Sequence, residues 1–90
     1  MIIDTLKVIW QTSEEEEDDD KEPYQYMCVR GLGFDLYAEE AYSEAMLLKA
    51  PRAWGEEQDK AYDRLLAEII EQARECDIMY SKITVNGEAI

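Results

Sequence analysis

One long amphipathic helix constrains the fold of this chain more than any other feature. From Gly55 to Asp77, apolar residues recur three or four positions apart, which is the spacing of one face of a helix with 3.6 residues per turn. At 1.5 Å per residue such a helix is about 30 Å long, the width of a small domain. Its apolar face must therefore pack on another layer of the protein. The face consists of Tyr62, Leu65, Leu66, Ile69, Ile70, Ala73 and Cys76.

The first part of the chain predicts β-strands. Residues 2–11, 24–30 and 34–37 are rich in β-branched and aromatic residues, and the first two segments alternate with a period of two. The segment Gly31-Leu32-Gly33 separates the last two strands, which therefore form either a hairpin or one long strand bent at the glycines. Within the first strand, one face holds Leu6, Val8 and Trp10.

The pattern changes after residue 37. Residues 38–49 repeat apolar side chains three and four positions apart, which predicts a helix that ends before Pro51. Residues 79–85 alternate again, and Asn86-Gly87 predicts a tight hairpin turn into a very short last strand. The chain is therefore expected to be a single α+β domain, residues 1–90. Two helices would pack on one face of a small antiparallel sheet of three to five strands, in the order β-β-β-α-α-β.

The charge of the chain excludes two classes of partner. It contains 22 Asp and Glu against 9 Lys and Arg, a net charge of -13. Such an excess repels phosphates, so neither nucleic acid nor an anionic membrane is expected to bind directly. A basic protein is the partner that this charge favours. Seven consecutive acids at 14–20 dominate residues 12–23, which we predict to be an exposed acidic loop.

The cysteines and the N-terminus indicate an intracellular protein. Cys28 lies in a predicted strand and Cys76 on the apolar face of the long helix. Both are expected to be buried free thiols, with a disulfide as the alternative if the two elements touch. The N-terminus lacks the basic segment of a signal peptide, and no apolar run reaches the roughly 18 residues of a membrane span. The expected location is the cytoplasm.

The chain lacks the residues of common catalytic and metal sites. It contains no histidine, and therefore neither the usual general base nor the usual zinc ligands. The segment Gly31-Leu32-Gly33 begins like a dinucleotide-binding fingerprint, but Leu36 stands where the third glycine is needed. The acidic run lacks the alternating ligands and central glycine of an EF-hand calcium loop. We expect no catalytic residue, metal or cofactor, and keep an enzyme that uses carboxylates as a secondary alternative.

The acidic residues are the predicted site for a partner. In an extended chain each residue advances ~3.3 Å, which is close to the ~3.4 Å rise between phosphates along one DNA strand. A row of carboxylates can therefore imitate a phosphate strand, although the run could instead serve only to keep the protein soluble. Trp54, between the two predicted helices, is a candidate interface anchor. The predicted partner-binding residues are Glu14, Glu15, Glu16, Glu17, Asp18, Asp19, Asp20, Glu22, Glu39, Glu40, Glu44 and Trp54.

Together these features predict an inhibitor or regulator of a basic, nucleic-acid-binding protein. The acidic surface would occupy the nucleic-acid site of that protein. Phage-encoded anti-defence proteins of the anti-CRISPR and anti-restriction types commonly combine small size, strong acidity and a lack of catalytic chemistry, and the chain resembles them in composition only. The alternative is a non-catalytic interaction module that self-associates as a homodimer or larger assembly through an exposed sheet edge or helix face.

Overall fold

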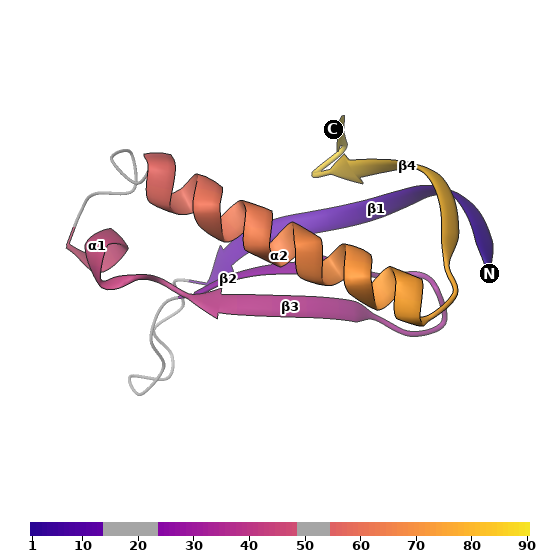
Figure 1. Ribbon diagram of the computed structural model, residues 1–90, viewed down its shortest axis with the longest axis horizontal. Helices are drawn as coiled ribbons and strands as arrows, with labels where there is room; N and C mark the ends of the chain where they lie inside the picture. Colours follow the sequence, from indigo (N-terminus) through magenta and orange to yellow (C-terminus); the bar gives the residue numbers. More distant parts are fainter. Residues whose placement is uncertain (14–23, 49–54) are drawn as a thin grey trace.

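Five strands form one sheet, and one long helix covers a single face of it (Figure 1). The structure is a computed structural model that describes residues 1–13, 24–48 and 55–90. The order of the strands in the sheet is β3-β2-β1-β4-β5, and the predicted α+β class is confirmed. The elements are β1 (Ile2–Ser13), β2 (Tyr24–Val29), β3 (Leu36–Ala41), α1 (Glu44–Leu47), α2 (Gly55–Glu75), β4 (Met79–Val85) and β5 (Glu88–Ala89).

The strands β1, β2 and β3 form an antiparallel meander. Ser13 pairs with Tyr24 at one end of the sheet, and Val29 pairs with Leu36 at the other. Gly31 and Gly33 both have positive φ values, 89° and 88°, which side chains with a Cβ rarely adopt. These glycines therefore turn the chain back on itself. Of the two sequence interpretations, the hairpin is correct and the bent strand is wrong.

The sheet is mixed, so the prediction of an antiparallel sheet was wrong for one pair of strands. Ile2 pairs with Met79 and Val8 with Val85 in a parallel register between β1 and β4. The reason lies in the path of the chain. Strand β3 runs parallel to β1, and α2 then returns the chain to the end of the sheet where β1 begins (Figure 1). The next strand must therefore run in the direction of β1.

The helix predicted over residues 38–49 is mostly absent, because part of that segment belongs to β3. Leu36 and Ala38 are buried while Tyr37 and Glu39 are exposed, which is the alternation of a strand. Pairing with β2 outweighs the helical propensity of this alanine- and glutamate-rich segment. Helix α1 begins only after Ser43, whose hydroxyl accepts a hydrogen bond from the backbone N–H of Met46 at 3.2 Å. It spans one turn, so α2 is the one helix that covers the sheet among the residues that the structure describes.

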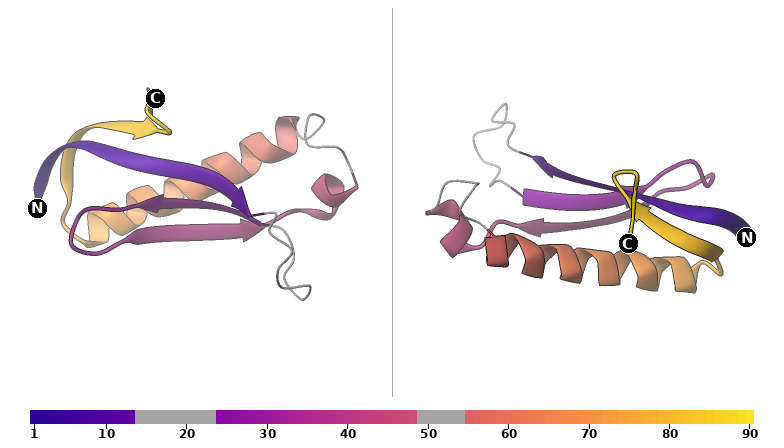
Figure 2. Two further views of the ribbon diagram at one scale, coloured as in Figure 1. Left: turned by 180° about the vertical axis from the view of Figure 1, so that it is seen from behind. Right: turned by 90° about the horizontal axis from the view of Figure 1, so that it is seen from above.

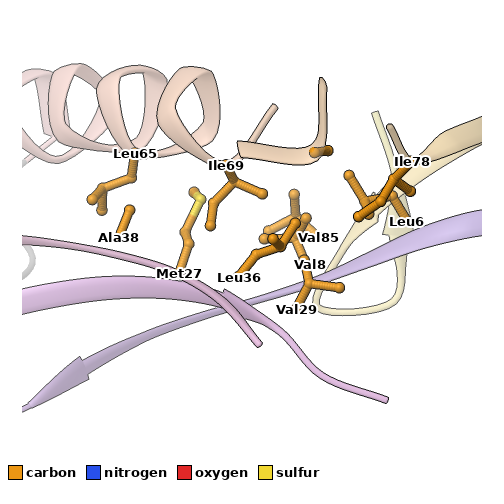
Figure 3. Packing of buried hydrophobic residues seen from close by; sticks show 11 residues of the cluster. Leu6, Val8, Met27, Val29, Leu36, Ala38, Leu65, Ile69, Ile78 and Val85 are labelled. Atoms are coloured by element: carbon orange, nitrogen blue, oxygen red, sulfur yellow. The ribbon is translucent and has the colours of Figure 1, made fainter. Parts of the chain in front are cut away.

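The core lies between α2 and the covered face of the sheet (Figure 3). Leu65 and Ile69 of α2 point toward Met27 of β2, and Leu6 and Val8 of β1 lie further along the same layer. The predicted helix and the predicted inward face of the first strand are therefore confirmed. The buried residues of this cluster are Leu6, Val8, Met27, Val29, Leu36, Ala38, Leu65, Ile69, Ala73, Ile78 and Val85.

The two cysteines differ in their environment. Both are free thiols, and Cys28 is buried as predicted. Cys76 is exposed, so its predicted burial was wrong. The reason is that α2 ends at Glu75, and Cys76 lies in the turn that leads through Asp77, where φ is 57°. The chain leaves the helical path one residue before the apolar pattern would bring Cys76 back to the core.

Asn86 connects the last hairpin to the first strand. Asn86 and Gly87 have φ values of 52° and 86°, and the turn joins β4 to β5 as predicted. The Asn86 side chain accepts a hydrogen bond from the Trp10 backbone N–H at 2.8 Å and donates one to the Trp10 carbonyl at 3.0 Å. These two bonds continue the parallel pairing beyond the Val8–Val85 pair and fix the position of β1 where β4 ends.

Replacing Ile69 by Ala should destabilise the fold strongly. The Ile69 side chain is 0% exposed, and its removal leaves a cavity between α2 and the sheet. A loss of about 2–5 kcal/mol in the free energy of unfolding is expected in urea titrations followed by circular dichroism. Leu48→Ala, at an exposed position, is the matched control and should change that free energy by less than about 0.5 kcal/mol. Equal effects of the two substitutions would contradict this assignment of the core.

Candidate partner-binding surface

The second face of the sheet is uncovered by any described element. Helix α2 lies on one side of the strands only, as the view from above shows (Figure 2). Because Leu6 and Val8 point toward α2, the residues between them along β1 point to the other side of the sheet. Residues that pair across neighbouring strands share a face, so the pairing register identifies the outward residues of β2, β3 and β4 as well. We call this surface the open sheet face. It comprises Thr5, Lys7, Ile9, Gln11, Tyr24, Tyr26, Cys28, Tyr37, Glu39, Lys82 and Thr84.

Three tyrosines form a strip across the β2–β3 half of the open sheet face. The ring centroids of Tyr24 and Tyr26 are 6.0 Å apart, and those of Tyr26 and Tyr37 are 5.7 Å apart in a stacked arrangement. The Tyr26 hydroxyl donates a hydrogen bond to Oε1 of Gln11 at 2.5 Å, and the Tyr37 hydroxyl donates one to Oε2 of Glu39 at 3.3 Å. These contacts hold the rings in place while Tyr37 remains 44% exposed. The tyrosine strip is a preorganised aromatic surface.

The hydroxyl of Tyr37 is held in its protonated form. Burial of the hydroxyl, and next the negative charge of Glu39, raise the pKa of Tyr37 to about 12. Tyr24 contributes a smaller effect in the same direction. The Tyr37 hydroxyl is therefore a hydrogen-bond donor throughout the neutral range.

Glu39, Glu40 and Glu44, three predicted partner-binding residues within the helix expected over residues 38–49, do not lie on one helix. Glu39 and Glu40 lie in β3, so their side chains point to opposite faces of the sheet. Glu39 lies on the open sheet face beside Tyr37, and Glu44 is the exposed first residue of α1. Glu40 accepts two hydrogen bonds from Arg64 of α2, at 2.6 and 2.9 Å. Its charge is therefore paired within the protein.

The remaining predicted site residues lie outside the described ranges. Glu14 to Asp20, Glu22 and Trp54 belong to residues 14–23 and 49–54. The points of attachment of the acidic segment are nevertheless known, because Ser13 and Tyr24 pair with each other at one end of the sheet. Residues 14–23 contain eight acids and one lysine, which is more than half of the net charge of the chain. Thr12 and Ser13 belong to β1, so the predicted loop begins two residues too early.

The outer edge of β3 is covered by side chains of α2. The Tyr37 backbone N–H donates to Oε1 of Gln72 at 3.1 Å, and Nε2 of Gln72 donates to the Tyr37 carbonyl at 2.6 Å. Arg64 binds Glu40 further along the same edge. The amide of Gln72 therefore occupies the hydrogen-bonding positions that an added strand would need at Tyr37.

The β1–β4 half of the open sheet face carries basic side chains. Lys7, Arg30 and Lys82 line a shallow hollow of about 640 Å³ together with Thr5 and Thr84. Lys82 is 3.7 Å from Asp4. The cations of α2, by contrast, form ion pairs. Lys60 pairs with Glu56, Arg64 with Glu40 and Arg74 with Glu71. The open sheet face is therefore electrically polarised, with the tyrosine strip at the acidic end and the hollow at the basic end.

The tyrosine strip and the basic hollow are the features that the sequence interpretation missed. The alternation of Tyr24, Tyr26 and Cys28 in the second strand does predict that the first two share a face. Tyr37 joins them only through the register of β3, and that strand was largely assigned to a helix. The hollow depends on the parallel pairing of β1 with β4, which was not predicted.

Within residues 1–13, 24–48 and 55–90, no group of three or more acidic or cysteine side chains is placed to hold a metal ion. No helix in these ranges is both long and apolar enough to cross a membrane. Comparisons with known protein families, curated proteins and solved structures find no match for this chain.

Tyr37→Phe should change the dependence of stability on alkaline pH. The folded protein holds the Tyr37 proton more tightly than the unfolded chain does. The stability that the Tyr37 hydroxyl contributes is therefore complete below pH ~10 and is lost as the pH rises toward 12. The variant should therefore lose less stability over this interval. Urea midpoints at several pH values would measure it, with Tyr80→Phe as the control. An equal loss of stability between pH ~10 and 12 in the parent protein and in Tyr37→Phe would contradict the protonated state assigned to Tyr37.

Proposed function

We propose that this chain is an acidic binding protein that inhibits a basic, nucleic-acid-binding protein by occupying its nucleic-acid site. One observation carries the proposal. The tyrosine strip begins at Tyr24, which pairs with Ser13 where the acidic segment is attached, and Tyr37 lies beside Glu39 on the same face. The Glu39 carboxylate and the partly exposed tyrosine rings thus lie on one part of the surface, and the acidic segment is attached next to Tyr24.

This combination fits the chemistry of a nucleic-acid-binding site. Such sites place Lys and Arg along the phosphate backbone and, for single strands, supply aromatic or guanidinium surfaces on which bases stack. The acidic segment would offer carboxylates in place of phosphates. The rings of Tyr26 and Tyr37 would offer flat π-faces in place of bases and would bind Arg side chains, each such contact contributing about 0.5–2 kcal/mol.

The two parts of the surface would contribute differently to binding. The acidic segment would accelerate encounter with a basic partner, and this effect falls as salt is added. The tyrosine strip would slow dissociation, because Tyr rings bury a large area at a small cost in side-chain entropy. The favoured biological form is an anti-defence role of the anti-CRISPR or anti-restriction type, supported by the composition of the chain.

Neutralising the acidic segment should weaken partner binding far more than neutralising α2. A variant with Glu14 to Asp20 converted to Gln and Asn loses seven charges. Its matched control loses seven charges on α2, at Glu56, Glu57, Asp59, Asp63, Glu68, Glu71 and Glu75. A fluorescein-labelled octa-arginine peptide serves as the basic probe, with anisotropy measured at about 50 and 200 mM NaCl. We expect at least a roughly tenfold loss for the first variant and less than about threefold for the second.

The same variants test inhibition directly. A basic partner captured from the host and purified would be loaded with a labelled oligonucleotide, which the parent protein should displace and the acidic-segment variant should not. Equal losses for both variants would show binding by overall charge alone. A captured partner that retains its oligonucleotide would overturn the proposed inhibition.

A further inference from the structure

Asn86 is bound to β1 by three hydrogen bonds. Its backbone N–H donates to the Val8 carbonyl at 2.9 Å. Its side chain accepts a hydrogen bond from the Trp10 backbone N–H at 2.8 Å and donates one to the Trp10 carbonyl at 3.0 Å. The carboxamide thus supplies the acceptor and the donor that a peptide group would supply in a parallel ladder. We call these two side-chain bonds the Asn86 clamp.

Asn86 is followed by the residue that makes an asparagine most reactive. An asparagine loses its side-chain amide when the backbone nitrogen of the next residue attacks Cγ, and glycine hinders this attack least because it has no Cβ. Asn86 and Gly87 are both exposed, and a Cβ at position 87 would meet no atom of the described residues within 4 Å. Asn86 is also the one asparagine of the chain. The chain therefore offers this reaction a single, solvent-accessible position.

We propose that Asn86 is a deamidation site which the clamp keeps closed and which reacts when the end of the β1–β4 pairing opens. In the closed form both polar atoms of the carboxamide are bound to Trp10 on the neighbouring strand. Cγ must leave this position to reach the Gly87 nitrogen, so both bonds must break first. The clamp lies beyond the last strand pair, Val8–Val85, where pairing opens more readily than in the core. Local opening therefore sets the rate, and complete unfolding is not needed.

The reaction consumes only water. The Gly87 nitrogen forms a bond to Cγ, and the bond between Cγ and Nδ2 breaks. Nδ2 leaves as ammonia and takes with it the proton of the Gly87 N–H. Water then cleaves one of the two C–N bonds of the resulting cyclic succinimide, which leaves either aspartate or isoaspartate at position 86. No group is oxidised or reduced.

Either product leaves the clamp incomplete, because a carboxylate accepts hydrogen bonds and cannot donate one. The Trp10 carbonyl loses its donor and faces a negative charge instead. In isoaspartate the main chain also passes through the former side chain, which lengthens the tight turn between β4 and β5. Asn86 and Gly87 line the basic hollow, so a negative charge is added there as well. The reaction thus converts a reversible opening of the β1–β4 end into a permanent one.

The rate of deamidation in the folded and in the unfolded protein tests the clamp. The parent protein would be incubated at mildly alkaline pH in buffer and in concentrated urea. Peptide mapping with electron-transfer mass spectrometry then measures aspartate and isoaspartate at position 86, and conversion should be at least about tenfold slower in the folded protein. A peptide of residues 83–90, incubated in both solutions, corrects for the effect of urea on the chemistry. Equal corrected rates in the two states would overturn the proposal.

Hydrogen exchange identifies the opening that controls the reaction. The Trp10 N–H exchanges when the clamp opens, so its protection factor should match the slowing of deamidation within about threefold. The N–H of Ile69, a fully buried residue of α2, should be protected far more strongly and reports unfolding of the core. A slowing that matches Ile69 rather than Trp10 would show that the protein must unfold to react, which contradicts local opening at Asn86.

Asn86→Asp supplies one of the two products directly. Its urea midpoint should lie below that of the parent at neutral pH, because the donor to the Trp10 carbonyl is missing. Gln58→Glu makes the same exchange of amide for acid on α2 and should keep the parental midpoint. An unchanged midpoint in Asn86→Asp would contradict the permanent opening. None of these measurements involves a partner, so the inference does not rest on the proposed function.

Discussion

The packing of the apolar stripe of α2 on one face of the sheet is the constraint on which the rest of this structure depends. Leu65 and Ile69 bury against strand residues such as Met27 and Ala38, and this packing fixes which way each strand faces. A strand that slips by one residue would expose its apolar set to solvent. The register of the sheet and the identity of the uncovered face therefore follow from this single interface.

That orientation determines what the surface can bind. With Met27 and Val29 turned toward α2, Tyr24 and Tyr26 must face outward, where Tyr37 stacks beside them. The same helix also covers the edge of β3 through Gln72, while no described strand pairs with the outer edge of β4 at residues 79–82. A polarised open sheet face and one uncovered edge are thus two separate consequences of covering a small sheet with one helix.

The sequence predicts the parts of this fold that depend on local patterns. The helix over residues 55–75 and the turn at Asn86-Gly87 follow from periodicity and backbone preference. The segment 38–41 has helical composition, and only the presence of β2 beside it makes it a strand. The parallel pairing of β1 with β4 joins residues 77 positions apart in the chain, which no local pattern encodes. Tyr37 escaped the predicted site for the same reason, since its neighbours come from another strand.

The most direct test of the account is a map of where a basic ligand binds. Amide shifts of the ¹⁵N-labelled protein would be followed during titration with an octa-arginine peptide at physiological salt. The largest shifts are expected along β2 and β3, around Tyr24, Tyr26 and Glu39, and in the acidic segment. Shifts concentrated on the outward residues of α2, with the tyrosine strip unchanged, would show that the helix rather than the open sheet face binds basic partners.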